Sequence, residues 1–273
     1  MAMTAYRNLS ANYSKMMLAM ERLSSGLRIN RAADDPAGLA ISEKMRAQIR
    51  GLEMAEKNAY DTISLIQTAE GALNETHLII QRIRELAVRA ANDTNTLEER
   101  QMIQMEINEL LDEIDAISGR TEFNTQKLLD GSFTDKKFHI GPNAGQNISF
   151  SIDEMSSAAL GLSSLRAESE GDTGGVLTQQ EANDAIGLLD DALKSVSMQR
   201  AKLGAKQNRL QHTINNLSVS RENLTAAESR IRDADIAKEM MNFTKYFILT
   251  QAAQAILAQA NQIPQGVLQL LRM

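Results

Sequence analysis

The sequence predicts a mainly α-helical protein, in which long antiparallel helices pack as a coiled-coil or bundle rod. Three observations lead to this expectation. The 273-residue chain has only three prolines and 4% aromatic residues, and helix-favouring residues dominate its composition. Apolar residues recur every seven positions over long stretches. One short segment instead alternates apolar and polar residues, which adds a small β-hairpin to the expected fold.

The composition also excludes several classes of function. The chain has no cysteine, so disulfides, thiolate catalysis and cysteine-based zinc sites are ruled out. The net charge is -6 with interspersed signs, so no nucleic-acid surface is expected. The histidines, His77, His139 and His212, fall on three different expected elements without a ligand-spaced partner. We identify no catalytic, cofactor-binding or metal-binding residues, and we predict that the protein is not an enzyme.

The first expected helix carries an apolar stripe whose members are spaced three and four residues apart in turn, as on one helix face. Its members are Tyr6, Leu9, Tyr13, Met16, Met20, Leu23 and Leu27. This helix should stop between Ser24 and Ile29. Gly26 and the corner from Asn30 to Pro36 break it, because proline disfavours helical geometry in the preceding residue.

A second helix is expected to begin near Pro36, where Asp34 or Asp35 can cap the free backbone N–H groups. Every seventh residue along it is apolar. This series comprises Met45, Leu52, Ala59, Ile66, Leu73, Ile80 and Ala87. The helix should run to about Asn92 and span roughly 80 Å. Residues 92–96, Asn-Asp-Thr-Asn-Thr, predict a turn.

A third helix and a hairpin are expected next. The helix carries a stripe of Ile103, Ile107, Leu110, Ile114 and Ile117. Residues 119–131 should be irregular. Between residues 137 and 153, apolar residues alternate with serines, which predicts two antiparallel strands around the GPNAGQ loop. The alternating residues are Ile148, Phe150 and Ile152, and the expected partners are Phe138 and Ile140.

A last long helix is expected from about Thr178, and its seven-residue series is unbroken. The members are Leu189, Val196, Leu203, Leu210, Leu217, Leu224 and Ile231. The series fails at Lys238, and beyond it apolar residues crowd several faces. The stretch from Tyr246 to Leu271 has no charge. Its seven amide side chains and its proline and glycine nevertheless argue against a membrane-spanning helix.

The sequence leaves the packing of the two ends open. Both ends carry apolar faces, and the uncharged C-terminal helix needs a partner. They could remain mobile in the monomer and fold against copies of the same chain. They could equally pair with each other as an intramolecular hairpin. The N-terminus lacks a basic region followed by an apolar run, so it is not read as a secretory signal peptide.

Several long segments resemble the conserved regions of bacterial flagellins. In the first half these are LSSGLRINRAADDPAGLAISEKMRAQIRGL, ISLIQTAEGALNETHLIIQRIRELAVRAAN and RTEFNTQKLLDG. In the second half they are QRAKLGAKQNRLQHTINNLSVSRENLTAAESRIRDADIAKEM and QAAQAILAQANQIPQGVLQLLR. The resemblance covers nearly the whole chain except residues 163–178. Flagellins usually carry several more residues before the match to AMTAYRNL, so this N-terminus is expected to be shorter than theirs.

The resemblance implies a terminal helical domain, residues 1–33 and 236–273, which is a two-helix coiled coil that lines the filament channel. Residues 34–235 would form the rod, and residues 166–175 the short loop where variable outer domains would be inserted. The implied function is a structural subunit that polymerises into the extracellular flagellar filament for motility, with terminal helices that fold on assembly. The residues expected to carry self-assembly are Leu9, Tyr13, Met16, Met20, Leu23, Phe243, Phe247, Ile256, Leu257, Leu268 and Leu271.

The resemblance also implies partners. The chain would be exported through the flagellar type III apparatus, with a chaperone on residues 242–272, and would meet filament cap and junction proteins. A Toll-like receptor contact would involve Arg82, Leu86, Arg89 and Glu106, although Arg89 stands where glutamine is common. No cofactor, nucleic acid or membrane span is implied. Two alternatives are a hook–filament junction protein and a surface-binding protein that shares the flagellin core.

Overall fold

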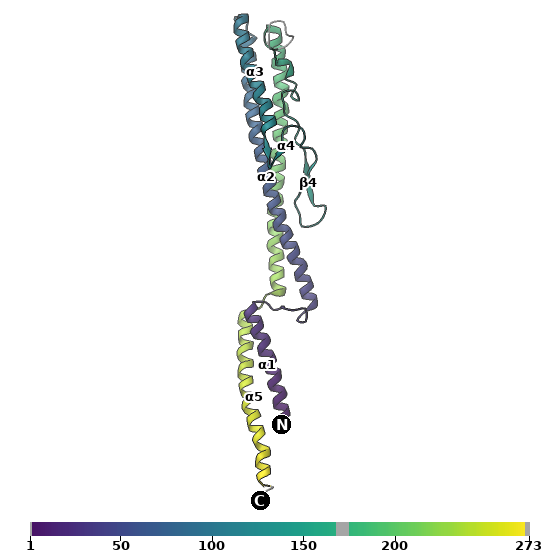
Figure 1. Ribbon diagram of the computed structural model, residues 1–273, viewed down its shortest axis with the longest axis vertical. Helices are drawn as coiled ribbons and strands as arrows, with labels where there is room; N and C mark the ends of the chain where they lie inside the picture. The colour runs from purple at the N-terminus through teal and green to yellow at the C-terminus, as the bar shows by residue number, and fades with distance from the viewer. Residues whose placement is uncertain (1, 168–174, 271–273) are drawn as a thin grey trace. The chain divides into compact units, whose positions relative to one another are not determined.

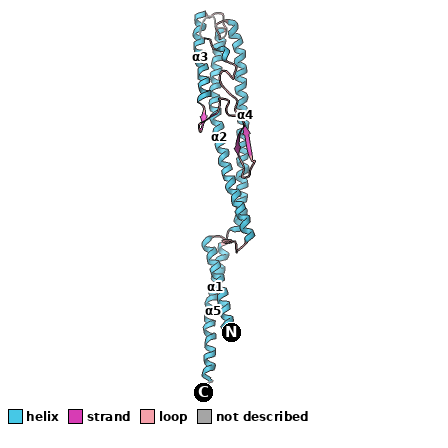
Figure 2. Ribbon diagram, turned by 45° about the vertical axis from the view of Figure 1, so that its right-hand side comes forward, coloured by secondary structure: helices cyan, strands magenta, loops and turns pink. Residues whose placement is uncertain are grey.

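The computed structural model describes residues 2–167 and 175–270, with side chains as far as Asn261 in the last helix (Figure 1). The long helices are α1 (Ala2–Ser25), α2 (Pro36–Ala90), α3 (Leu97–Arg120), α4 (Gln179–Arg232) and α5 (Ile236–Leu270). Two antiparallel pairs of short strands and one 3-10 turn lie between α3 and α4 (Figure 2). The mainly α-helical fold with a small β-hairpin is therefore confirmed.

The chain divides into two compact units. One contains residues 1–50 and 221–273, and the other contains residues 51–220. Both boundaries fall inside the long helices α2 and α4, which contribute residues to each unit. The division expected from the sequence instead follows the breaks at 33/34 and 235/236, and it remains a prediction.

The second unit is a rod in which α2, α3 and α4 pack around one apolar core (Figures 1 and 2). The seven-residue series account for much of this core. Ala59, Ile66, Leu73, Ile80 and Ala87 from α2 are fully buried, and α4 buries Leu189, Val196, Leu203 and Leu210. In α3 the buried apolar face is Ile103, Ile107, Leu111 and Ile114. It differs from the expected stripe in that Leu111 takes a fully buried position, while Leu110 and Ile117 are half-buried against the core. Because these residues repeat on one face of each helix, their spacing predicts their burial well.

The predicted hairpin is present as strands β3 (Lys136–His139) and β4 (Asn147–Phe150), with Phe138 opposite Ile148. Phe138 of β3 and Phe150 of β4 pack together with Phe133, which precedes the hairpin. The rings of Phe138 and Phe150 are stacked with centroids 4.9 Å apart. The hairpin is attached to α2, because Asn58 Nδ2 donates to the His139 carbonyl at 3.1 Å. It is attached to α4 by Lys206, whose ammonium donates to the Ser149 carbonyl.

The expectation that residues 119–131 are irregular was wrong in part. They contain a second, very short hairpin, β1 (Glu122–Phe123) with β2 (Gln126–Lys127). Its turn places Asn124 and Thr125 in the left-handed region, with φ of 49° and 64°. Two residues with positive φ form the turn that suits the twist of paired strands, and asparagine tolerates it. Strands of two residues are too short to show an alternating pattern.

A side chain of α3 fastens the chain on both sides of residues 168–174. Gln104, which is buried, donates from Nε2 to the Leu165 carbonyl at 2.7 Å and accepts at Oε1 from the Val176 N–H at 2.8 Å. Its neighbour Asn108 donates to the Ala167 carbonyl at 2.8 Å. These contacts satisfy backbone groups that would otherwise be buried without partners.

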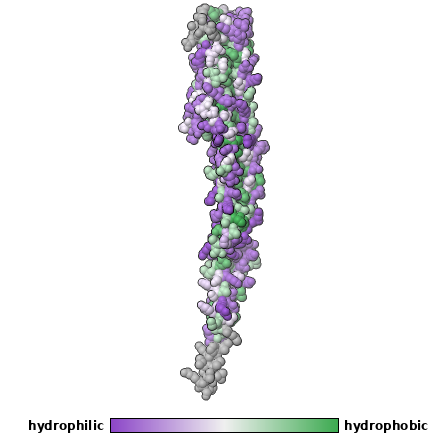
Figure 3. All heavy atoms as spheres, turned by 90° about the vertical axis from the view of Figure 1, so that its right-hand side faces the viewer, coloured by the Kyte–Doolittle hydropathy of each residue, from purple (hydrophilic) through white to green (hydrophobic). Residues whose placement is uncertain are grey.

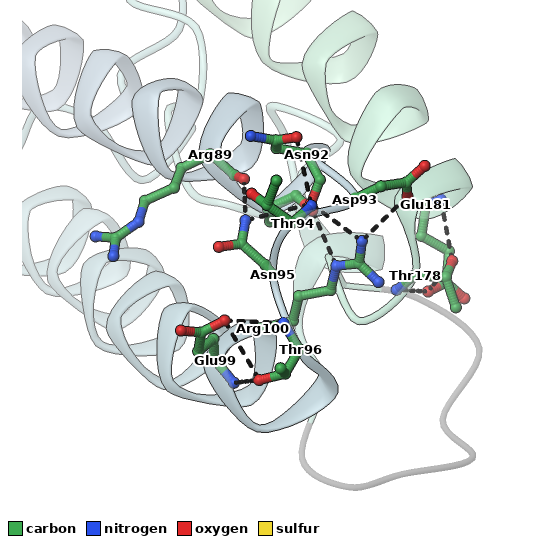
Figure 4. Close-up of polar contacts among 11 residues, drawn as sticks. Arg89, Asn92, Asp93, Thr94, Asn95, Thr96, Glu99, Arg100, Thr178 and Glu181 are labelled. Atoms are coloured by element: carbon green, nitrogen blue, oxygen red, sulfur yellow. Dashed lines mark hydrogen bonds and ion pairs between the residues drawn. The ribbon is translucent and has the colours of Figure 1, made fainter.

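Polar contacts close the turn between α2 and α3 (Figure 4). Thr96 caps α3 in a reciprocal box, in which its hydroxyl accepts from the Glu99 N–H and the Glu99 carboxylate accepts from the Thr96 N–H at 2.8 Å. The guanidinium of Arg100 donates to the carbonyls of Ala90 and Asn92, at 3.0 and 3.3 Å. It thereby neutralises the carbonyl end of α2.

The first unit contains two connectors, residues 26–35 between α1 and α2 and residues 233–235 between α4 and α5. They meet as one antiparallel bridge, Leu27 opposite Asp233. The Ala234 N–H donates to the Gly26 carbonyl at 2.9 Å, and Gly26 adopts a φ of 71° that suits glycine. The guanidinium of Arg28 donates to the last carbonyls of α4. The corner before Pro36 is thus held by hydrogen bonds to the end of α4 and to the connector that follows it.

Two neighbouring aspartates shape this corner differently. Asp35 caps α2, since its carboxylate accepts from the Gly38 N–H at 2.9 Å. Asp34 closes the loop before it, because its Oδ2 accepts from the N–H groups of Arg31 and Asn30 at 2.9 and 3.0 Å. These donated hydrogen bonds, Arg31 first and Asn30 second, lower the pKa of the Asp34 carboxyl below its ordinary value.

Ion pairs surround the same corner. Arg232 pairs with Glu43 at 2.6 Å, and this hydrogen bond lowers the pKa of the Glu43 carboxyl. Arg46 pairs at 2.7 Å with Glu228, whose side chain is largely buried. Since these groups are oriented by helices α2 and α4, each pair adds a specific distance constraint rather than a large stabilisation.

We predict that Thr96→Ala lowers the free energy of unfolding by about 1 kcal/mol, because α3 loses the acceptor for its free N–H group. Urea unfolding followed by circular dichroism measures the change. Thr94→Ala is the matched control, since it removes an exposed threonine side chain from the same turn. An equal loss in both variants would contradict the capping role.

The lowered pKa of Asp34 also predicts a pH dependence. A carboxyl whose pKa is lower in the folded state stabilises the fold above its unfolded pKa of about 3.9, and this stabilisation is lost as the pH falls through the folded pKa. Asp34→Asn should therefore be less stable than the unsubstituted chain at pH 7, and the two should converge as the pH falls through the folded pKa of Asp34, which lies below its ordinary value.

Thermal unfolding across this pH range tests the prediction. The control is Asp61→Asn, an exposed carboxylate on α2 outside the corner. A difference between the Asp34→Asn chain and the unsubstituted chain that stays constant with pH would show that the charge of Asp34 is not involved.

Candidate self-assembly surface

Helices α1 and α5 pack against each other as an antiparallel pair, and α1 begins at the end of the pair towards which α5 runs (Figure 1). This terminal pair meets through a narrow seam of heptad spacing. The α1 side consists of Ala2, Ala5, Leu9, Asn12, Met16, Ala19 and Leu23, all buried or half-buried. The α5 side consists of Glu239, Phe243, Tyr246, Thr250, Ala253, Leu257 and Ala260. Most seam positions are therefore small or polar residues.

The structure corrects the apolar stripe expected on α1. Leu9, Met16 and Leu23 lie in the seam. Tyr6, Tyr13 and Met20 do not, and they are 64%, 52% and 43% exposed. Two heptad patterns overlap on this helix, offset by one residue. The expected stripe combines members of both, because the seam positions Ala5, Asn12 and Ala19 carry no large apolar side chain that would mark them in the sequence. The offset of one residue turns the second pattern by about 100° around the helix.

Large apolar residues on several sides of the terminal pair remain uncovered. Together we call them the open surface. On α1 it comprises Met3, Tyr6, Tyr13, Met17, Leu18 and Met20, and on α5 it comprises Ile236, Met240, Met241, Phe247, Ile248, Leu249 and Ile256. Figure 3 draws one face of the molecule, on which apolar residues in green lie among hydrophilic residues in purple. Monomeric proteins rarely expose contiguous apolar patches beyond a few hundred Å².

Part of the open surface is hollowed into a groove along α1. The groove is shallow and open, and its volume is about 670 Å³. Its apolar lining is Tyr13, Met17, Leu18 and Met20, and its polar lining is Ser14, Glu21, Ser24 and Arg31, of which Arg31 pairs with Glu21 at 2.9 Å. On two antiparallel helices, residues one position after the seam project to the same side of the pair. Met240 and Phe247 of α5 therefore lie on the same side of the pair as Tyr13 of α1.

The seam buries its apolar residues incompletely. Ala19 and Ala253 are its fully buried apolar residues, and an alanine contributes only about one methyl group of apolar burial, whereas its large apolar residues, such as Leu9 and Phe243, are half-buried. The register is set instead by polar contacts. Arg22 pairs with the buried Glu239 at 3.4 Å, and the Lys15 ammonium lies 5.7 Å from the ring centre of Tyr246. No local sequence pattern indicates these contacts, and they were not expected.

The remaining residues expected to carry assembly are distributed between the two faces. Phe243 and Leu257 are half-buried in the seam, whereas Phe247 and Ile256 belong to the open surface. The rings of Phe243 and Phe247 stack with centroids 6.1 Å apart. The last two, Leu268 and Leu271, lie outside the described side chains. The expected set also omitted three residues that are as exposed as its members, Met17, Met240 and Ile248.

The residues expected to contact a receptor lie on the rod. Arg82 of α2 donates to the Glu106 carboxylate of α3 at 2.9 and 3.0 Å, and this pairing, together with Glu85, raises the pKa of Arg82. Arg89 is exposed and extends away from the turn (Figure 4). Leu86 is buried in the core, so it does not present a surface side chain. Receptor contact by these residues stays a prediction.

Other kinds of site are not found in the described parts of the chain. The described residues contain no group of three histidine, aspartate or glutamate side chains that could hold a metal ion. Among the helices as far as they are described, none is long and apolar enough to cross a membrane. The open surface is thus the strongest candidate for a functional site.

Comparison with known proteins agrees with this picture. Residues 1–134 match the bacterial flagellin N-terminal helical region, and residues 186–271 match the bacterial flagellin C-terminal helical region. The chain is 57% identical to a flagellin of Bacillus subtilis (strain 168), with 99% of this chain and 97% of that protein covered. It is 54% identical to a flagellin of Halalkalibacterium halodurans, with the same coverage.

A solved structure is similar as well. The crystal structure of Bacillus cereus flagellin matches with a TM-score of 0.51 and 29% identity, and the match covers 63% of this chain and 94% of that chain. The matched terminal regions and the two relatives, more than half identical over nearly their whole length, show that this chain belongs to the bacterial flagellin family.

Proposed function

We propose that this chain is the repeating structural subunit of a bacterial flagellar filament, and that neighbouring copies cover the open surface of the terminal pair. The carrying observation is that α1 and α5 expose thirteen large apolar residues while their shared seam is built largely from small or polar residues. A surface of this kind is unfavourable in water and is stabilised by removal from it.

The shape of the open surface favours an open-ended polymer. Its residues lie on both helices of the pair and on more than one side of α5, since Met240 and Met241 are adjacent in sequence and point about 100° apart. One copy therefore cannot cover all of it in a single two-fold contact. Contacts between different patches on successive copies repeat head to tail, and such contacts generate helical filaments when they do not close into a ring.

The magnitudes are consistent with assembly through several neighbours. Full burial of a large apolar side chain contributes about 1.5–3 kcal/mol, and these side chains are roughly half exposed. Covering all thirteen therefore contributes roughly 10–20 kcal/mol. The entropic cost of association is about 4–15 kcal/mol. Stable assembly thus requires most of the open surface to be covered.

The same reasoning supports terminal helices that become fully ordered on assembly. An isolated helix is marginal in water, and the α1–α5 seam leaves its large apolar residues only half-buried. We propose that the terminal pair opens readily in the unassembled subunit and is stabilised when neighbouring copies cover Tyr13, Met17 and Phe247. Localisation outside the cell, export through the type III apparatus and a chaperone on residues 242–272 belong to this proposal, as do contacts with filament cap and junction proteins.

The alternative functions are less well supported. A hook–filament junction protein would share the terminal regions, yet the similarity to flagellins extends over 99% of the chain. A surface-binding protein would need a ligand site, and the rod offers no inserted domain, since few residues separate Ala167 from Gly175. Receptor contact through the Arg82–Glu106 pair and through Arg89, two helical turns further along α2, is a further proposal whose basis is exposure of these groups.

A paired substitution tests the assembly surface directly. Tyr13→Ser with Phe247→Ser removes two exposed rings from the open surface. We expect the helical content of the subunit to be unchanged and the critical concentration for polymerisation to rise by about 10- to 100-fold, because each lost contact contributes roughly 1 kcal/mol or more. Sedimentation and electron microscopy measure assembly.

The matched control is Tyr60→Ser with Leu78→Ser on the rod, two residues with comparable exposure, 49% each. It should polymerise like the unsubstituted chain. Equal inhibition by both double variants would show that the terminal pair has no special role in assembly.

Deleting residues 242–273 removes most of α5 and leaves α1 without its partner. We expect a soluble helical rod that no longer polymerises, whereas the full chain gains helicity as filaments form. Circular dichroism at rising concentration, with electron microscopy of the same samples, checks both parts. Filaments formed by the shortened chain would contradict the proposal.

A further inference from the structure

The exposed methionines among the described residues fall into two sets of similar exposure. The terminal pair carries Met3, Met17, Met20, Met240 and Met241, which are 43–81% exposed. The rod carries Met54, Met102, Met105 and Met198, which are 52–64% exposed. Every member of the first set belongs to the open surface. The second set is spread over α2, α3 and α4.

Methionine has a chemical property that the other apolar residues of the open surface lack. Its thioether sulfur is oxidised by peroxides to a sulfoxide, which is polar and hydrogen-bonding, and reductases reverse the change. Leucine, isoleucine and phenylalanine offer no comparable reversible reaction. Methionines thus form five of the thirteen residues of an assembly surface whose favourable energy comes from being apolar.

The positions of these sulfurs make the change consequential. Met17 and Met20 line the groove on α1 together with Tyr13. Met240 lies one residue after the seam, on the side of the pair that Met17 shares. A sulfoxide in a contact between apolar side chains is desolvated without a partner, which is unfavourable. A few oxidised residues therefore affect the same contact.

We propose that Met3, Met17, Met20, Met240 and Met241 form a reversible oxidation site, at which a peroxide blocks polymerisation of the unassembled subunit. The inference rests on the proposed function, because it requires the open surface to be the contact between copies. Assembly covers the same sulfurs, so they react with peroxide more slowly in filaments than in free subunits.

The reaction balances with hydrogen peroxide as the oxidant. The sulfur lone pair attacks one peroxide oxygen, an S–O bond forms and the O–O bond breaks. The sulfur loses two electrons, and the peroxide is reduced to water after the departing hydroxide takes up a proton. Reduction by methionine sulfoxide reductases, with thiols as electron donors, returns the thioether and releases the oxygen as water.

The test uses the full chain in its unassembled state. Subunits are treated with hydrogen peroxide, freed of it and brought to polymerising conditions, while peptide mass spectrometry locates each sulfoxide. We expect the five methionines of the open surface to be oxidised and the critical concentration to rise by about tenfold or more. Circular dichroism should show that the rod keeps its helical content.

Two leucine variants separate the two sets. Met→Leu at positions 3, 17, 20, 240 and 241 keeps the open surface apolar without oxidisable sulfur, and this variant should polymerise after peroxide treatment. Met→Leu at positions 54, 102, 105 and 198 should remain as sensitive as the unsubstituted chain. Protection by the rod variant, or normal filaments from chains carrying the five sulfoxides, would overturn the inference.

Treatment of the oxidised, unsubstituted chain with both stereospecific reductases supplies an independent readout, which does not depend on the folding of a variant. Loss of the sulfoxides should restore polymerisation, and a failure to restore it would count against the inference. The two proposals remain distinguishable. If untreated subunits form no filaments, the proposed function fails. If untreated and oxidised subunits polymerise alike, only the oxidation site fails.

Discussion

The shallow contact between α1 and α5 is the constraint on which the rest of the structure depends. A seam in which Ala5, Asn12 and Ala19 alternate with larger residues brings two helices close together but removes little apolar surface from water. The large side chains of the seam are only half-buried, and a second set, including Tyr13 and Phe247 one residue after seam positions, faces outwards. The fold is therefore complete as a backbone arrangement and incomplete as a hydrophobic core. In the proposed function, association between copies completes it.

The rod, in contrast, has a complete apolar core. Its helices place large residues such as Ile66, Ile107 and Leu189 on facing stripes, so burial is achieved within one chain. The corner around Arg28 and Asp34 buries one apolar side chain, Ile29, and depends on polar contacts for the rest. There, backbone bridges and charge-assisted hydrogen bonds fix the path of the two connectors, which apolar packing could not do with so few residues.

Sequence reasoning succeeded where a single large residue type marks each turn of a helix. The series through Leu189 and Leu203 predicted the buried face of α4, because apolar residues repeated every seven positions lie on one face of a helix and are buried together. Sequence reasoning failed where the contact residues have small side chains or are far apart in the sequence. The small and polar residues of α1 were not recognised as seam positions, and the Arg22–Glu239 pair joins residues 217 positions apart, for which no local pattern exists. The choice between Asp34 and Asp35 as the cap needed backbone geometry.

The clamp formed by Gln104 has a consequence for how such a molecule can grow. The side-chain amide of Gln104 is hydrogen-bonded to the backbone of both Leu165 and Val176. The chain segments that contain these two residues are therefore held together on the surface of α3. Doubling the length of a closed loop costs only about 0.6 kcal/mol when its ends are held together. Residues inserted between Leu165 and Val176 would therefore lie outside the rod, and the packing of α2, α3 and α4 against one another would be unchanged.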